Sequence, residues 1–109
     1  MSPGWPPADA EGFDLRPDPL QARSPTEFTA VLRRYRAWSG DPSFREIAGR
    51  AGGRIAASTI WQALQDGDAM PRMEVVVAIV AGCGGSEEDQ RRFTTAWRAI
   101  RLATAPGPP

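Results

Sequence analysis

The sequence predicts an all-α fold, a compact bundle of five short helices. Three observations predict it. Apolar residues recur at intervals of three and four along most of the chain, which is the spacing of one helix face. Serine and glutamate pairs mark helix starts, and glycines mark helix ends. No stretch alternates apolar and polar residues as a half-buried strand would.

The prolines separate a folded middle from the two ends of the chain. Nine of the 11 prolines lie in the first 25 and the last four residues. Residues 1–23 have no apolar period and an acidic bias, so we expect a disordered Pro-rich arm there. Residues 24–103 form the expected domain, and residues 104–109 form a flexible tail or linker.

The first helix has the clearest signals. Ser24 can cap it, Pro25 suits its first position, and Glu27 completes a capping box three residues after the serine. Gly40 ends the helix, because glycine accepts the left-handed backbone that closes a helix. One apolar stripe follows the helical period: Phe28, Val31, Leu32, Tyr35 and Trp38.

Two shorter helices follow in the middle of the chain. A second capping box, Ser43 with Glu46, starts the first of them, and a glycine pair ends it. The next runs from about Ala57 to Leu64; Ala56 at its N-cap offers no acceptor, although Ser58 could cap a shorter helix. The expected inward residues are Phe44, Ile47, Ala48 and Ala51, then Ile60, Ala63 and Leu64.

The last two helices follow the loop "QDGDAMPR". One is expected from Pro71 or Arg72 to about Gly82, and the other from Ser86, with carboxylates in its first turn where the helix dipole favours them. Their expected inward residues are Met73, Val76, Val77, Val80 and Cys83, then Phe93, Ala96, Trp97 and Ile100.

The composition excludes most catalytic chemistry. The chain has no histidine and no lysine, hence no Ser-His-Asp triad, imidazole metal ligand, P-loop or Schiff base. Cys83 falls on an inner stripe and is read as a small core residue. Asp66 with Asp68 is read as a solvated loop, and residues 87–89 as a helix cap. We expect no enzyme, no metal and no cofactor.

The chain carries no membrane signal. A single cysteine excludes an internal disulfide and fits a reducing compartment, so we expect a cytoplasmic protein. The first residues lack the pattern of a signal peptide, and the longest apolar run, "VVVAIVAGCGG", is too short to span a bilayer.

The charge is distributed unevenly. Net charge is zero, which argues against a strong nucleic-acid binder as a whole. Residues 26–65 nevertheless hold six arginines against three carboxylates, a net charge of +3. The central motif therefore lies in the basic part of the chain.

This central motif, "REIAGRAGGRIAASTIWQAL", has the residues that a helix-turn-helix needs. Ala48 is small where the two helices would cross, Gly52 allows the turn, and Ile60 anchors the second helix. The turn is about two residues longer than the shortest pattern of this kind. An ordinary αα-hairpin would need the same residues for packing.

The segment from Thr26 to about Ile100 resembles the lambda-repressor-like (Cro/repressor-type) helix-turn-helix domains of actinobacteria. The matching pieces stand in the family's order: Arg45-Glu46-Ile47-Ala48, Ser58-Thr59-Ile60, Met70-Pro71, Cys83-Gly84-Gly85 and Trp97. The resemblance implies a five-helix fold and sequence-specific DNA binding. The chain departs from the family at three positions, Gly49, Ala56 and Ala57, which weaken the shape and charge of the expected reading surface.

The helix from about Ala57 to Leu64 is the expected reading helix. Gln62 can make a bidentate contact to adenine, Ser58 can bond a base edge or a phosphate, and Trp61 can lie against a thymine methyl. Arginines around the turn can bind phosphates. The expected DNA contacts are Arg45, Arg50, Arg54, Ala57, Ser58, Thr59, Trp61, Gln62 and Gln65.

These observations lead to two functional hypotheses. The first is a repressor-type transcription regulator that binds double-stranded DNA in the major groove, with dimerisation or fusion to a larger protein needed for useful affinity. The alternative is a module of the same shape that does not bind DNA and docks a protein through Trp61, as the N-terminal domain of a larger signalling protein would. The uncharged reading helix favours the alternative; the arginine excess and the motif order favour DNA.

Overall fold

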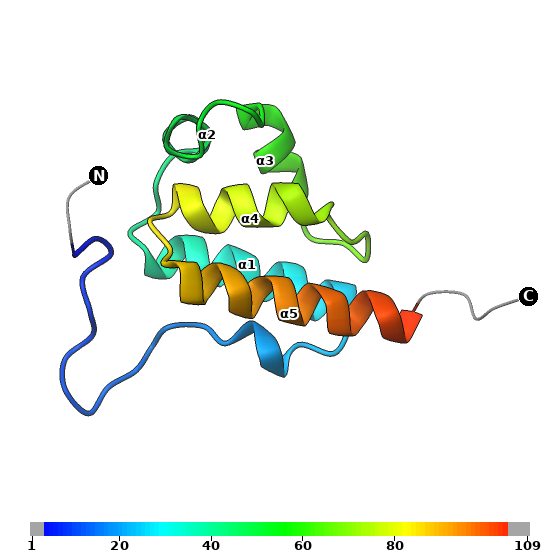
Figure 1. Ribbon diagram of the computed structural model, residues 1–109, viewed down its shortest axis with the longest axis horizontal. Coiled ribbons are helices and arrows are strands. Elements are labelled where there is room, and N and C mark those ends of the chain that lie inside the picture. Colours follow the sequence, from blue (N-terminus) through cyan, green and yellow to red (C-terminus); the bar gives the residue numbers. More distant parts are fainter. Residues whose placement is uncertain (1–3, 105–109) are drawn as a thin grey trace, which may run out of the picture.

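The computed structural model describes residues 4–104, and this part of the chain is all-helical, as predicted (Figure 1). Five α-helices and one short 3-10 helix make up its regular structure, with no strand in the described range. The bounds are η1 Pro19–Gln21, α1 Pro25–Trp38, α2 Phe44–Arg50, α3 Ala57–Ala63, α4 Met73–Gly82 and α5 Glu87–Thr104. Nearly all of the predicted tail lies outside the described residues.

The fourth helix, α4, occupies the centre of the bundle. It packs against α1 and α5 on one side and against α2 and α3 on the other (Figure 1). None of the helices between residues 4 and 104 has the length and apolar character needed to cross a membrane. The core between the helices is formed mainly by Phe28, Leu32, Tyr35, Ile47, Ile60, Val76, Ile79, Val80, Cys83, Phe93 and Ile100.

The helix starts follow the predicted capping chemistry with one difference. The capping box of Ser43 and Glu46 is complete, with both reciprocal hydrogen bonds present. Ser24 accepts from the backbone N–H of Glu27, but the Glu27 carboxylate accepts from Arg23, one residue before the cap. The first predicted capping box is therefore only half correct. No side chain caps α3, so Ser58 does not replace the missing acceptor at its start.

The predicted inner stripe of α4 is partly wrong. Val76, Val80 and Cys83 are buried as expected, but Met73 and Val77 are half-buried. Val75 and Ile79 take their places in the core. Apart from Glu74 in its first turn the helix is apolar, so no continuous polar face in the sequence shows which residues point inward. The helices that pack on its two sides decide it.

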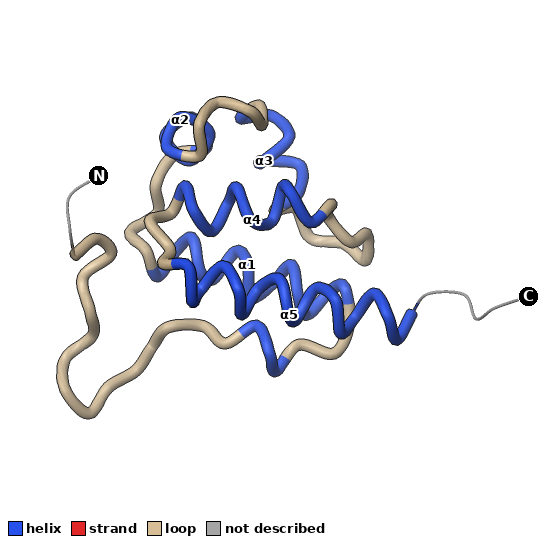
Figure 2. Tube along the Cα trace, viewed as in Figure 1, coloured by secondary structure: helices blue, strands red, loops and turns tan. Residues whose placement is uncertain are grey.

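The disorder predicted for residues 1–23 is not confirmed. Residues 4–23 follow a defined path along one side of the bundle before α1 begins (Figure 2). Pro19 is buried, and η1, which the Asp18 side chain caps, packs against α5. The arm is held by contacts to residues far along the chain, and such contacts leave no local period in the sequence.

Candidate functional site

The outward face of α3 carries the residues predicted to read DNA. Trp61 is 50% exposed, and Ser58, Gln62 and Gln65 are exposed as well. The opposite face of the helix is anchored in the core by Ile60. Because α3 lies at the edge of the bundle with α2, this face is open to a partner (Figure 1).

The side chains on this face differ in whether they already form hydrogen bonds within the protein. Gln65 donates its amide N–H to the carbonyl oxygen of Trp61 at 2.9 Å. Gln62 and Ser58 make no side-chain hydrogen bond to any residue between 4 and 104, so their polar groups are available to a ligand. Ala57 and Thr59 are half-buried. The side chain of Ala57 is a methyl group, so it can make only an apolar contact with a ligand.

The three arginines predicted to bind phosphates are all exposed, and they differ in their pairing. Arg45 at the start of α2 and Arg54 in the α2–α3 loop form no salt bridge within the described range. Arg50 pairs with Glu46 one turn earlier, at 3.1 Å. An exposed pair of this kind is worth less than about 1 kcal/mol, so Arg50 can exchange this partner for a phosphate.

The α3 helix itself carries no charged side chain, and the nearest charges in sequence are Arg54 before it and Asp66 after it. Arg33 of α1 bonds the carbonyl oxygen of Leu64 at 3.3 Å and lies 3.9 Å from Asp66. These contacts fix the C-terminal end of α3 against α1 and offset part of the negative charge.

A shallow depression lies beside the reading face, with a volume of about 360 Å³. Thr59 and Gln62 of α3 line one wall, and Met70 and Pro71 of the following loop line another. Trp61 does not line it. The half exposure of Trp61 leaves a large apolar ring surface in contact with solvent.

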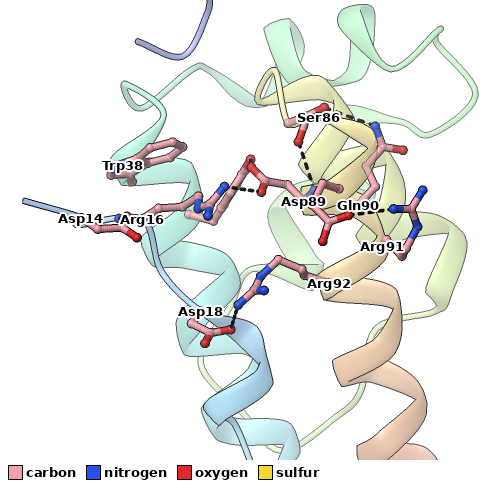
Figure 3. Close-up of polar contacts among 12 residues, drawn as sticks. Asp14, Arg16, Asp18, Trp38, Ser86, Asp89, Gln90, Arg91 and Arg92 are labelled. Atoms are coloured by element: carbon pink, nitrogen blue, oxygen red, sulfur yellow. Dashed lines mark hydrogen bonds and ion pairs between the residues drawn. The ribbon is translucent and has the colours of Figure 1, made fainter. Parts of the chain in front are cut away.

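A second polar cluster, which the sequence did not predict, joins the arm to α1 and α5 (Figure 3). Asp89 is buried; one carboxylate oxygen accepts from the Tyr35 hydroxyl at 2.6 Å and the other from Arg16 at 2.9 Å. Arg92 binds Asp18 at 2.7 Å. The sequence indicated only a capping role for residues 87–89, since the partners of Asp89 lie 54 and 73 residues away and form no motif with it.

The charged and polar groups of this cluster are paired with one another. Burial, and then the hydrogen bond to Asp89, raises the pKa of Tyr35 far above its ordinary value. Burial alone would raise the pKa of Asp18, but hydrogen bonds from the Leu20 backbone and from Arg92 hold it below its usual value. No buried side-chain polar atom in the described part of the chain lacks a partner. Within that part, no three acidic or cysteine side chains gather closely enough to hold a metal ion.

Comparison with known proteins found no family model, no curated protein and no solved structure that matches this chain.

Proposed function

We propose that α2 and α3 form a helix-turn-helix and that the chain is a sequence-specific regulator that reads double-stranded DNA in the major groove with α3, in the cytoplasm. The observation that carries the proposal is the outward face of α3. The polar groups of Ser58 and Gln62 on this face have no partner in the described part of the chain. The helix packs against α2, and the arginines of α2 and of the α2–α3 loop are exposed.

The side chains divide into those that read bases and those that bind the backbone. Gln62 presents a donor and an acceptor together, which matches the edge of adenine in the major groove. Ser58 can bond a base or a phosphate, and Trp61 supplies an apolar surface for a thymine methyl. Arg45, Arg50 and Arg54 supply positive charge for phosphates, which positions the helix without selecting sequence.

The footprint of one such module is small. Three arginine–phosphate contacts give only weak binding at physiological salt. Two modules on one duplex, placed about one helical turn apart, would combine their contacts. A regulator built on this chain is therefore expected to act as a dimer or as part of a larger protein.

The binding of the arginines to the DNA phosphates is tested with matched arginine variants. Their affinity for a mixed-sequence duplex is measured at low salt by fluorescence anisotropy. Arg45→Ala should weaken binding by about three- to tenfold on every sequence, because a phosphate contact is lost. Arg98→Ala removes the same charge from an exposed position of α5, away from α3, and should leave binding within about twofold. Equal losses in both variants would show that only net charge matters and would contradict the placement.

The reading role is tested by selection of bound sequences from a random library. Gln62→Ala should relax the preference at one base-pair position by about 1–3 kcal/mol and leave the other positions unchanged. A selected motif identical to that of the original chain would show that α3 does not read the groove through Gln62.

A second candidate function is supported by Trp61. A half-exposed tryptophan on a helix without charge has the character of a hot spot in a protein interface. In that case the same face docks a protein, and the chain shows no affinity for DNA even at low salt. The DNA measurement therefore separates the two functions.

A further inference from the structure

The arm presents two apolar side chains to solvent in a fixed position. Phe13 is 69% exposed and Leu15 is 71% exposed, and Asp14 stands between them. We call residues 13–15 the arm hook. Large apolar side chains that are held outward side by side usually mark a contact surface.

Polar contacts on both sides hold the arm hook in place. The Asp9 carboxylate accepts from the backbone N–H of Leu15 at 2.8 Å and from the indole N–H of Trp38 at 3.1 Å. Directly after the hook, Arg16 binds the buried Asp89 (Figure 3). These contacts place the hook beside the bundle, where Phe13 and Asp14 line a depression of about 410 Å³ with Trp38. Both apolar side chains nevertheless remain more than two-thirds exposed.

An apolar groove lies elsewhere on the same molecule, between α4 and the α2–α3 loop. Its volume is about 400 Å³. Arg54 and Glu74 also line it; Glu74 is paired with Arg72 at 3.1 Å, whereas Arg54 forms no salt bridge within residues 4–104. We call it the α4 groove, and its apolar lining is Ala51, Ile55, Met73, Val77, Ala78 and Ala81.

We propose that the α4 groove binds the arm hook of a second copy of this chain, and that two copies exchange hooks in a symmetric dimer. Phe13 and Leu15 supply the apolar side chains that the groove would bury. Asp14, which forms no ion pair in the described range, would meet Arg54. An exchange about a two-fold axis closes after two copies, because each copy gives one hook and receives one.

A second copy fits better than another partner because this chain carries both complementary parts. The Asp14 carboxylate accepts the backbone N–H of Arg16 at 3.3 Å but forms no ion pair within residues 4–104. It therefore matches a groove whose Arg54 guanidinium also forms no salt bridge there. The net charge of zero means that two copies do not repel each other. A molecule's own hook is tethered beside α1 and α5, whereas the α2–α3 loop lies at the opposite side of the bundle (Figure 1). The proposal does not depend on DNA binding, although an Arg54 that pairs with Asp14 in the dimer is not free to bind a phosphate.

Sedimentation equilibrium of the full chain over a range of concentrations tests the proposal. We expect a monomer–dimer equilibrium, which Phe13→Ala with Leu15→Ala should weaken by at least about tenfold. Leu102→Ala is the matched control, because Leu102 is also an exposed apolar residue, 77% exposed, but lies at the end of α5. Circular dichroism should show the same helix content in all variants, since the substituted side chains are exposed.

A charge exchange tests the pairing of hook and groove. Asp14→Arg and Arg54→Asp should each weaken the dimer about threefold to tenfold, and the two changes together should restore it. Asp68→Arg, at an exposed loop position, is the control for net charge. A chain that stays monomeric at the highest concentration overturns the proposal. Three other results would also overturn it: a dimer affinity that the hook variants leave unchanged, a double variant whose dimer affinity stays low, or association beyond two copies.

Discussion

The buried contact between Tyr35 and Asp89 provides the strongest stability prediction. Asp89→Ala leaves the Tyr35 hydroxyl without its partner in a site where the tyrosine is 1% exposed. An orphaned buried polar group costs about 1–3 kcal/mol, and a hydrogen bond to a charged group contributes about 1.5–3 kcal/mol. The lost ion pair to Arg16 adds little, because the Arg16 side chain is 39% exposed. We expect a loss of about 3 kcal/mol, a large share of the stability of a small domain.

A double-mutant cycle of Tyr35→Phe and Asp89→Ala separates the energy of this contact from the other effects of each substitution. Tyr35→Phe alone should cost about 2 kcal/mol, and Asp89→Ala should cost only about 1 kcal/mol once the hydroxyl is absent. Urea denaturation followed by circular dichroism gives the four free energies of unfolding. A coupling energy below about 0.5 kcal/mol would refute the reasoning, because it would mean that the two groups are not in contact in a dry site.

Two other predictions concern close packing and alkaline pH. A Cβ at Gly82 would collide with the backbone and side chain of Ile47, so Gly82→Ala should destabilise the fold by about 2 kcal/mol in urea denaturation, although alanine favours helices; an unchanged or raised stability would contradict the contact. Burial raises the pKa of Cys83 and of Tyr35, so the unfolded chain loses these protons first as pH rises. The free energy of unfolding should fall by about 1.4 kcal/mol per pH unit for each group, above roughly pH 8.5 for the thiol and pH 10 for the phenol. Tyr35→Phe should abolish the fall in unfolding free energy above about pH 10, and a fall that persists in this variant would have another cause. Few other groups titrate in this range, because the chain has no lysine.

The sequence was sufficient where local chemistry decides the structure. The Ser43–Glu46 box, the glycines that end α1 and α2, and the apolar stripe of α1 involve residues within one or two turns of each other. The exposure of Gln62 and the burial of Ile60 on α3 follow from the same helical period.

The remaining features depend on contacts that the sequence does not show. The residues of α4 that face the core are decided by the helices on both sides of it, and Glu74 in its first turn is the one polar residue that marks its outer face. The arm has the composition of a disordered segment, but Asp9, Arg16 and Asp18 find partners 29 to 74 residues away. Trp5 lies against Gly40 and Gly84, where a larger side chain on either glycine would approach it closely.

The salt dependence of binding to a mixed-sequence duplex tests the proposed function most directly. If three arginines of each bound copy replace counterions on the phosphates, the logarithm of the association constant should fall against the logarithm of salt concentration with a slope of about −2.7 per copy. The measurement uses fluorescence anisotropy of the unmodified chain, begun at low salt. Absence of binding at the lowest salt, or binding that does not change with salt, would contradict a DNA-reading role for α3.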